Sequence, residues 1–587
     1  MLEFIAINMA PIMFGSLIVF LLLGYPVAFS LAANGLLFFA IGVWLAPWSA
    51  GNITLDWSLL GTMPQRVWGT MSNDTLLAIP FFTFMGIVLE RSGMAEDLLD
   101  TVGQLFGPIR GGLAYAVIIV GALLAATTGV VAASVIAMGL ISLPIMLRYG
   151  YDRRVASGVI AASGTLAQII PPSLVLIVLA DQLGRSVGDM YAGAFIPGLV
   201  LTGLYMVYVF AISLWRPDWV PALPPEARTL GHGVTSLLLA LLACIGIGYA
   251  AHVWLSPTQG ANADILGATV GVLVIYAYAV IDKSLKLNSM SRLAQQVIIV
   301  LIPPLALVFL VLGTIFLGIA TPTEGGAMGA LGAMVLAAMK GRLNYGVITQ
   351  ALASTTRLSA FVIFILLGAR MFSLTFYGVN GHVWVEHLLV SLPGGVTGFL
   401  IFVSVLVFLL AFFLDFFELA FIIVPLLVAP AEALGIDLIW FGVILAVNMQ
   451  TSFMHPPFGF ALFYLRSVAP RAPYADKVTG ARLAGVSTGQ IYWGAVPFVV
   501  IQVAMIGITI AFPSMVMHYK GTVVDPATIE IKVPTLQTLA PSGGTTLGAP
   551  KLGAPNLGAP DTTAPAEGGT VAPALPGPKL GAPVINP

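Results

Sequence analysis

The feature that most constrains this chain is a series of apolar runs, each about 20 residues long. Met13–Phe29, Leu199–Leu214 and Val297–Phe316 are examples, and each is long enough to cross a bilayer as a helix. Only 8% of the 587 residues are charged, whereas a soluble domain carries roughly a quarter. The sequence therefore predicts an all-α polytopic membrane protein surrounded by membrane lipid.

Several functional classes find no support in the sequence. The formal net charge is −1, so nothing indicates a nucleic-acid partner. The single cysteine, Cys244, cannot form an internal disulfide. No nucleotide P-loop or H-E-x-x-H motif occurs, which argues against a zinc protease and against an ATP-driven pump working alone. We expect no organic cofactor.

Two stretches of the sequence match each other. Gly150–Pro172 and Gly435–Pro457 both begin with Gly-x-Asp and end with Pro-Pro, and the glycine precedes the first proline by the same distance (171 − 150 = 456 − 435 = 21). Downstream, GDMYAGAFIP from Gly188 pairs with GQIYWGAVP from Gly489. Two-fold internal repetition in a membrane protein is typical of secondary transporters.

The basic loops give an orientation, because Lys and Arg concentrate on the cytoplasmic side. With these loops in the cytoplasm, the segment from Gly150 runs outward and the segment from Gly435 runs inward, so the repeats are inverted. The same rule predicts that the chain after the last span lies in the periplasm. The loops used are 148–154, 216–228, 283–292, 340–342 and 466–482.

Composition breaks divide the chain into four parts. A Pro-rich, charged stretch precedes two extra apolar runs in the middle, and Leu-Gly-Ala-Pro repeats dominate the end, which predicts a disordered tail or, alternatively, a tether. The predicted parts are a first repeat half (1–215), a linker with an inserted helix pair (216–295), a second half (296–512) and a Pro/Gly/Ala-rich tail (513–587).

Two apolar stretches, about 111–147 and 396–430, are too long for one span and short for two with a loop. Polar residues interrupt each near its middle. A re-entrant hairpin with its tip at mid-membrane fits both, provided that the tip is buried in protein or lines a cavity. The alternative is two short full spans with a tight turn outside the membrane. The tip residues are Thr127, Thr128, Gly129 and Ser134 in the first, and Asp415 and Glu418 in the second.

A Pro-Pro pair interrupts the helix that follows each hairpin, about 153–180 and 436–465. Proline lacks the backbone N–H and clashes with the preceding turn, so backbone carbonyls at the break lose their helical hydrogen bonds. These carbonyls, with the hydroxyl and amide side chains beside them, offer the oxygen ligands that a sodium ion prefers. The N-terminus of each half-helix suits an anionic group. The alternative is that the prolines only kink packing helices. The candidate residues are Gly164, Thr165, Pro171, Pro172 and Ser173, then Asn448, Gln450, Thr451, Ser452, His455, Pro456 and Pro457.

Three ionisable side chains in these segments have open roles. A carboxylate in a bilayer is costly, so Asp415 is expected to contact a cation, carry a proton or cap a half-helix. Glu418 could instead be the cap. His455 could bind substrate or titrate, although a lone histidine is more often a hydrogen-bonded structural residue.

Three motifs together carry a family resemblance. GIATPTEGGAMGALGAM, the RYGYDRR…IIPPS run with its GDMYAGAFIPG continuation, and NMQTSFMHPPFGFALFYLR resemble the large membrane subunit of tripartite ATP-independent periplasmic (TRAP) transporters, the DctM-like permeases. The resemblance covers about 9–512 except the inserted pair, and the last motif is similar to the branch labelled mannitol/chloroaromatic compound transport. The first tip is poorer in serine than is usual, and Phe416-Phe417 make the second unusually bulky.

This resemblance implies an elevator mechanism of the ion transporter superfamily type, in the bacterial inner membrane. It implies sodium as the coupling ion, a small four-helix membrane subunit, and a periplasmic binding protein that delivers a small-molecule substrate, usually a carboxylate. A stand-alone sodium- or proton-coupled carrier of the same architecture is the alternative, and a channel is a further one. Sodium ligands are then expected among Thr127, Gly129, Thr165, Asp415, Asn448, Thr451 and Ser452.

Overall fold

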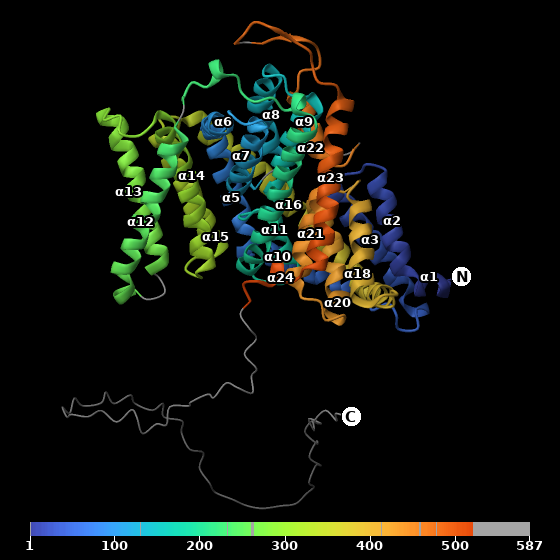
Figure 1. The fold of residues 1–587 in the computed structure, drawn as a ribbon. Helices are drawn as coiled ribbons and strands as arrows, with labels where there is room; N and C mark the ends of the chain where they lie inside the picture. Colours follow the sequence, from blue (N-terminus) through green and yellow to red (C-terminus); the bar gives the residue numbers. More distant parts are fainter. Residues whose placement is uncertain are drawn as a thin grey trace, which may run out of the picture. The chain divides into compact units, whose positions relative to one another are not determined.

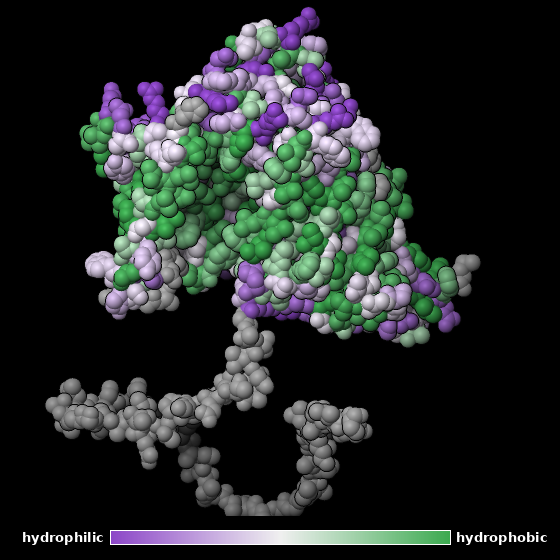
Figure 2. Space-filling view, viewed as in Figure 1, coloured by the Kyte–Doolittle hydropathy of each residue, from purple (hydrophilic) through white to green (hydrophobic). Residues whose placement is uncertain are grey.

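The computed structural model describes residues 2–129, 131–231, 233–259, 263–412, 414–456, 459–476 and 478–520. Within this part, nine helices are long and apolar enough to cross a membrane, or up to eleven if each of two bent pairs counts as one span. Figure 2 shows an apolar band across the middle of the visible face, with hydrophilic residues gathered toward its two ends. The chain is a multi-pass helical membrane protein, as the apolar runs predict.

The first half carries the first hairpin as α7 and α8 and the first broken helix as α9 and α10. Its helices are α1 (Leu2–Ile7), α2 (Met9–Leu22), α3 (Val27–Leu45), α4 (Met63–Met71), α5 (Asp74–Arg91), α6 (Met94–Phe106), α7 (Gly112–Thr128), α8 (Val131–Arg148), α9 (Arg153–Thr165), α10 (Leu174–Gln182) and α11 (Val187–Trp215). Short 3-10 turns are η1 (Ala46–Trp48), η2 (Trp57–Thr62), η3 (Leu166–Gln168), η4 (Pro217–Trp219) and η5 (Pro225–Ala227).

The inserted pair consists of α12 (Val234–Gln259) and α13 (Ala263–Leu285). The two helices stand side by side at one edge of the helical body and pack against α14 (Arg292–Phe316) (Figure 1). A small apolar core of their own joins the three helices, and it contains Ala240, Ile275, Ala279 and Ile298. Their other faces expose large apolar side chains, which is expected of helices that contact lipid.

The second half carries its hairpin from α18 to α20 and its broken helix as α21 and α22. Its elements after α14 are α15 (Pro322–Met339), α16 (Tyr345–Gly378), α17 (Gly381–Val390), α18 (Gly395–Leu410), α19 (Phe416–Glu418), a π-helical turn η7 (Leu419–Ile423), α20 (Val424–Ala433), α21 (Leu438–Thr451), α22 (Phe460–Val468), strands β1 (Tyr474–Ala475) and β2 (Arg482–Leu483), α23 (Thr488–Ala511) and α24 (Ser514–Met517). The strands pair antiparallel.

Both broken helices start in the same way. Asp152 caps α9 by accepting hydrogen bonds from two backbone N–H groups, and Asp437 caps α21 in the same manner. Two residues earlier, Gly150 and Gly435 adopt the left-handed conformation (φ +83° and +70°), which glycine takes most easily. The shared Gly-x-Asp motif is therefore a local signal for a turn followed by a helix N-terminus.

The broken helices run in opposite directions. Gly442, near the start of α21, lies against Leu183, which directly follows the end of α10. At the other end of the pair, Leu465 and Val468 near the end of α22 lie against Gly139 of α8, the helix that leads into α9. The start of α21 thus lies beside the end of α10, which is a relation that an inverted repeat requires.

The helices can be divided by their main contacts into a flanking and a central group, although α5 of the flanking group also contacts α7 and α10. In the flanking group, α3 packs on α16 and α5 packs on α15, with Gly35 against the backbone of Met371 and Gly368 against that of Ala28. In the central group, α7, α8 and α23 pack on α9, and α18 and α23 pack on α21. The central group contains both broken helices.

The C-terminal end of the described chain packs on the central group. Val516 of α24 is fully buried and lies against Gly193 of α11. Lys520 Nζ lies 2.6 Å from Asp437 Oδ2, so it bonds the residue that caps α21. The ordered chain therefore extends past residue 512, where the tail was predicted to begin, and the remainder of that tail lies outside the described residues.

Candidate functional site

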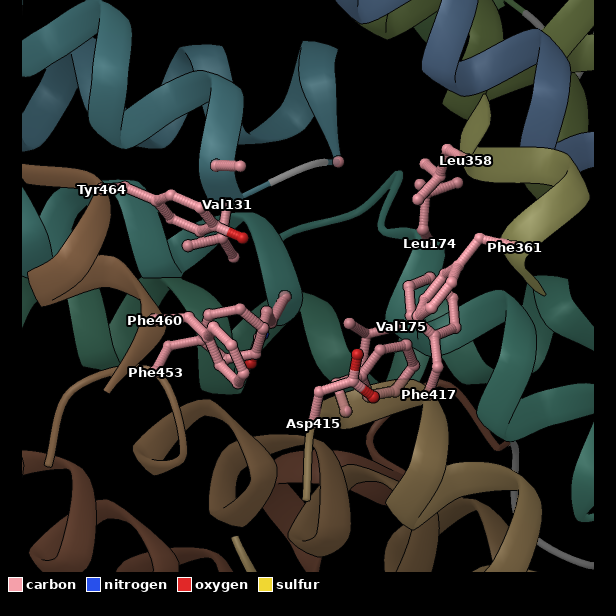
Figure 3. Close-up of a pocket in the computed structure, with 14 residues that line it drawn as sticks. Val131, Leu174, Val175, Leu358, Phe361, Asp415, Phe417, Phe453, Phe460 and Tyr464 are labelled. Atoms are coloured by element: carbon pink, nitrogen blue, oxygen red, sulfur yellow. The ribbon is translucent and has the colours of Figure 1, made fainter. Parts of the chain in front are cut away.

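A cavity of about 260 Å³ lies where both hairpins and both broken helices meet (Figure 3). It draws residues from five separate stretches of the chain, 129–132, 168–175, 358–361, 415–417 and 453–464. The residues that line it are Gly129, Val131, Ala132, Gln168, Leu174, Val175, Leu358, Phe361, Asp415, Phe416, Phe417, Phe453, Phe460 and Tyr464. The structure thus brings together the four segments that the sequence singled out.

The tip of the first hairpin touches the first break through Gly129. This residue ends α7 with φ +58°, and a β-carbon placed on it would lie 3.2 Å from Leu174 Cγ and 3.4 Å from Leu174 N. Glycine therefore allows both the turn and the close approach. Ser134 of α8 is buried nearby in the chain, and the side chains of Thr127 and Thr128 lie outside the described part of the structure.

At the first break, a cis Pro171-Pro172 bond separates η3 from α10. The Ser173 hydroxyl donates to Gln168 O at 2.6 Å and accepts from Val175 N at 3.2 Å, so it caps α10. Gln168 lines the cavity, and its Oε1 is buried without a hydrogen-bond partner among the described residues. A buried carbonyl oxygen in that state is suited to an ion, a water or a donor on a substrate.

At the second tip, Asp415 and Glu418 form a reciprocal capping box. Asp415 Oδ1 accepts from Glu418 N and Glu418 Oε2 accepts from Asp415 N, each at 2.9 Å. The predicted capping role is therefore confirmed for both residues. Figure 3 shows the Asp415 carboxylate at the edge of the cavity, whereas Glu418 lines a separate cavity of about 400 Å³ beside the Gly24–Pro26 turn.

At the second break, hydroxyl groups bond back to their own helix. Thr451 Oγ1 donates to Asn448 O and Ser452 Oγ donates to Met449 O, each at 2.6 Å. Because each hydroxyl hydrogen is used, the oxygen is left as an acceptor, which is the state that a cation needs. Asn448 donates to Ser404 O at 2.7 Å, and its buried Oδ1 has no partner among the described residues.

His455 lies apart from the cavity. Its ring stacks on Phe412 with centroids 4.1 Å apart and meets Phe408 edge-on at 4.9 Å. Both ring nitrogens are buried without a partner among the described residues, and His455 does not line the cavity. Packing against α18 is the role that this geometry supports. Pro456 directly follows, and Pro457 lies outside the described residues.

Three further predicted residues, Gly164, Thr165 and Gln450, do not line the cavity. Gly164 approaches Val135 of α8 so closely that a β-carbon would lie 2.3 Å from its side chain. Thr165 and Gln450 face each other, with Gln450 Nε2 donating to Thr165 Oγ1 at 3.1 Å.

The aromatic lining of the cavity was not predicted from the sequence. Phe361, Phe453, Phe460 and Tyr464 surround it together with Phe417, and Figure 3 shows their rings around the central space. Among the described lining residues there is no Lys or Arg. The only available signal was that Phe453 and Phe460 flank the second Pro-Pro pair.

Comparison with protein families gives one match. The model of the tripartite ATP-independent periplasmic transporter, DctM component, matches residues 14–515. A C4-dicarboxylate TRAP transporter large permease protein of Pseudomonas aeruginosa is 28% identical over 408 residues, which cover 69% of this chain and 79% of that protein.

More distant relatives carry other names. An ectoine TRAP transporter large permease protein of Halomonas elongata is 24% identical, covering 87% of this chain and 99% of its own length. A sialic acid TRAP transporter permease protein of Haemophilus influenzae is 22% identical, covering 85% and 66%. Among solved structures, the Alcanivorax borkumensis YdaH transporter matches with a TM-score of 0.48 and 14% identity, covering 83% of this chain and 99% of that one.

Proposed function

This chain belongs to the family of DctM components of tripartite ATP-independent periplasmic (TRAP) transporters, and from that premise we propose that it is the large permease subunit of a sodium-coupled importer of a small organic acid. The observation that carries the proposal is the single cavity between two tips and two breaks. Discontinuous helices that meet at a cavity are where secondary transporters bind substrate and ions. Transport, not catalysis, is the activity.

The donor set around the second break fits a sodium ion. It offers the hydroxyl oxygens of Thr451 and Ser452 and the Oδ1 of Asn448, which has no partner among the described residues, while Asp415 brings a carboxylate to the cavity. Sodium prefers oxygen ligands of this kind over sulfur or nitrogen. At the first break we assign the ion site to backbone carbonyls, to Gly129 and to the Thr165 hydroxyl.

Bound sodium would also supply the positive charge that an anionic substrate needs in the cavity. No Lys or Arg is found among its described lining residues, and Asp415 contributes a carboxylate, so an acid would meet no side-chain cation there. Bound sodium and the N-terminus of α10 supply the positive potential that the substrate needs. Import is then driven by the sodium gradient and by the membrane potential, at about 2.3 kcal/mol per charge per 100 mV.

The two helix groups suit an elevator. The central group carries both breaks and both hairpins, which enter the membrane as re-entrant pairs, and it slides against the flanking group of α3, α5, α15 and α16. A small four-helix subunit enlarges the flanking group in the bacterial inner membrane, and a periplasmic binding protein delivers the substrate. The substrate names of the relatives differ, and the mannitol/chloroaromatic branch remains a prediction.

Reconstitution tests the proposal. The chain is placed in proteoliposomes with its small subunit, and its binding protein is supplied with the acid that it retains on purification. We expect uptake that saturates, requires an inward sodium gradient and stops when either partner is left out. Uptake by the chain alone would favour the alternative, a stand-alone sodium- or proton-coupled carrier, and uptake without sodium dependence would contradict sodium coupling.

A further inference from the structure

A buried polar cluster that does not line the cavity lies between α9, α11, α21 and α23. It consists of Thr165, Tyr205, Gln450 and Gln502, and each of the four is 0% exposed. Gln502 donates to Tyr205 OH at 2.9 Å and to Thr165 Oγ1 at 3.4 Å, while Gln450 donates to Thr165 Oγ1 at 3.1 Å. One hydroxyl therefore joins both broken helices to α23 and, through Gln502, to α11.

Thr165 and Gln450 occupy equivalent places in the two halves. Thr165 precedes Pro171 by the same number of residues that separates Gln450 from Pro456 (171 − 165 = 456 − 450 = 6). Two equivalent positions of a two-fold repeat can touch each other only near the axis that relates them. The hydrogen bond between Thr165 and Gln450 therefore lies at the internal symmetry axis, one helical turn or two before each break.

The hydrogens in this cluster can be assigned. Thr165 Oγ1 lies 2.8 Å from Ala162 O, a carbonyl that can only accept, so the single hydroxyl hydrogen is given there. Both glutamine amides are placed to donate to Thr165 through Nε2, and neither Oε1 atom bonds it. Neither oxygen has a partner among the described residues. Leaving a buried acceptor unpaired is unfavourable, so a rearrangement that satisfies it is favoured.

The same assignment affects the sodium sites. A hydroxyl oxygen has two lone pairs, and those of Thr165 are taken by Gln450 and Gln502. The Thr165 hydroxyl can contact an ion at the first break only if its hydrogen bond with Gln450 or with Gln502 breaks. Any such change moves an amide that belongs to the second broken helix or to α23.

We propose that Thr165, Gln450, Gln502 and Tyr205 form a positioning network on the internal symmetry axis that couples ion binding at one helix break to ion binding at the other. Filling the first break redirects hydrogen bonds at Thr165, and Gln450 carries the change to the turn that holds Thr451 and Ser452. The inference rests on the proposed sodium coupling, and it adds that the two sites fill cooperatively.

The test uses Gln502→Leu, which removes both amide contacts at similar side-chain volume. Thr202→Val is the matched control, because Thr202 is the counterpart of Gln502 in α11 (202 − 197 = 502 − 497 = 5), is buried, and bonds only its own helix through Gly198 O. Sodium-dependent uptake is measured in the full reconstituted complex. We expect a Hill coefficient for sodium near 2 in the wild type and in Thr202→Val, falling to about 1 in Gln502→Leu.

Tyr205→Phe keeps the ring contact with Phe498 and removes only the hydroxyl that accepts from Gln502. It gives a milder probe if Gln502→Leu does not fold, and we expect an intermediate Hill coefficient. Sodium-dependent uptake with an unchanged Hill coefficient in the folded variants would overturn the network alone, as would an equal fall in Thr202→Val. Sodium-independent uptake by the wild type would overturn the proposed function and the network with it.

Discussion

The two helix breaks share a backbone plan and differ in side-chain chemistry. Both follow a Gly-x-Asp start, both end at Pro-Pro, and equivalent residues are 285 positions apart (456 − 171 = 285). Where the second break has Thr451 and Ser452, the first has Leu166 and Ala167. The two breaks therefore share the residues that turn and cap the backbone. They differ in the side chains that offer oxygen atoms beside the break.

The hairpin tips differ in the same direction. The first tip, at Gly129, offers backbone and a close contact with α10. The second presents two carboxylates in a capping box, one facing the main cavity and the other facing the turn between α2 and α3. The second tip therefore contributes the charged side chains, whereas the first contributes a close backbone contact.

The largest effect is expected from removing the hydroxyl groups at the second break, which makes its side chains as apolar as those at the first. In Thr451→Val with Ser452→Ala, sodium-driven uptake should fall about 100-fold, because losing two oxygen contacts to a desolvated cation costs about 3 kcal/mol. The helix itself should persist, since both hydroxyls only bond back to it.

The matched control for that double variant is Ser157→Ala, which removes a similar back-bonded hydroxyl far from the break in α9. It should leave initial uptake rates unchanged. Normal uptake by the double variant, with normal amounts in the membrane, would show that hydroxyl ligation is the wrong mechanism.

Asp415→Asn tests whether the acidic tip does more than cap a helix. Asparagine caps as well as aspartate, so the fold should be kept while the charge is lost. We expect the sodium concentration for half-maximal uptake to rise about tenfold, equal to about 1.4 kcal/mol.

Glu418→Gln serves as its partner, because glutamine also completes a capping box and Glu418 faces the other cavity. Its sodium response should stay close to that of the wild type. If both variants respond to sodium like the wild type, the carboxylates are structural.

The glycine tip can be tested through a pair of alanine substitutions. Gly129→Ala and Gly395→Ala both force alanine into a left-handed conformation, at about 1 kcal/mol each. Only at Gly129 would the new methyl group meet the start of α10, because nothing lies within 4 Å at Gly395. Uptake should drop several-fold in Gly129→Ala alone, while thermal unfolding shows a similar loss for both. Equal uptake would mean that the tip does not need this contact.

The smallest expected effect concerns the connection after each broken helix. Residues 183–186 join α10 to α11, whereas the longer connection after α22 forms the β1–β2 ribbon. Arg148 at the end of α8 fixes this ribbon by binding Asp476 with two hydrogen bonds of 2.9 Å. Hydrogen bonds from Arg148 and Thr479 hold the pKa of the Asp476 carboxyl well below its ordinary value.

Because the pKa of Asp476 is lower in the folded protein, its carboxylate stabilises the fold at any pH above the unfolded-state pKa of about 3.9. This stabilisation is lost as the pH falls through the folded-state pKa. Asp476→Asn should therefore lower the melting temperature at pH 7 by a few degrees, and the gap to the wild type should narrow below about pH 4. Uptake at pH 7 should change little. A gap that widens on acidification would contradict this account.

Local signals explain most of what the sequence predicts correctly. Apolar length, Gly-x-Asp starts and Pro-Pro breaks each act within about one or two helical turns, so spans, the inserted pair and both breaks could be placed. The convergence of the four segments followed from the repeat, since a symmetric partner of a binding element belongs to the same site.

Contacts between distant residues could not be predicted in this way. Phe361 reaches the cavity from the flanking group, and nothing in its neighbourhood in the sequence marks it. The sequence leaves His455 open between a binding residue and a structural one, and only the structure shows that Phe408 and Phe412 cover its ring. Whether a polar residue faces a cavity or a packed helix depends on helix rotation, which spacing alone leaves undetermined.

The anchor between Lys520 and the cap of α21 has a practical consequence. A fluorophore placed at this anchor lies beside the start of α21 and would report the displacement that the proposed elevator mechanism predicts for the central group. A second label at the single cysteine Cys244, in α12 of the inserted pair, would give a second reference point. The distance between the two labels could then be measured in single molecules during transport, which would show whether the central group moves.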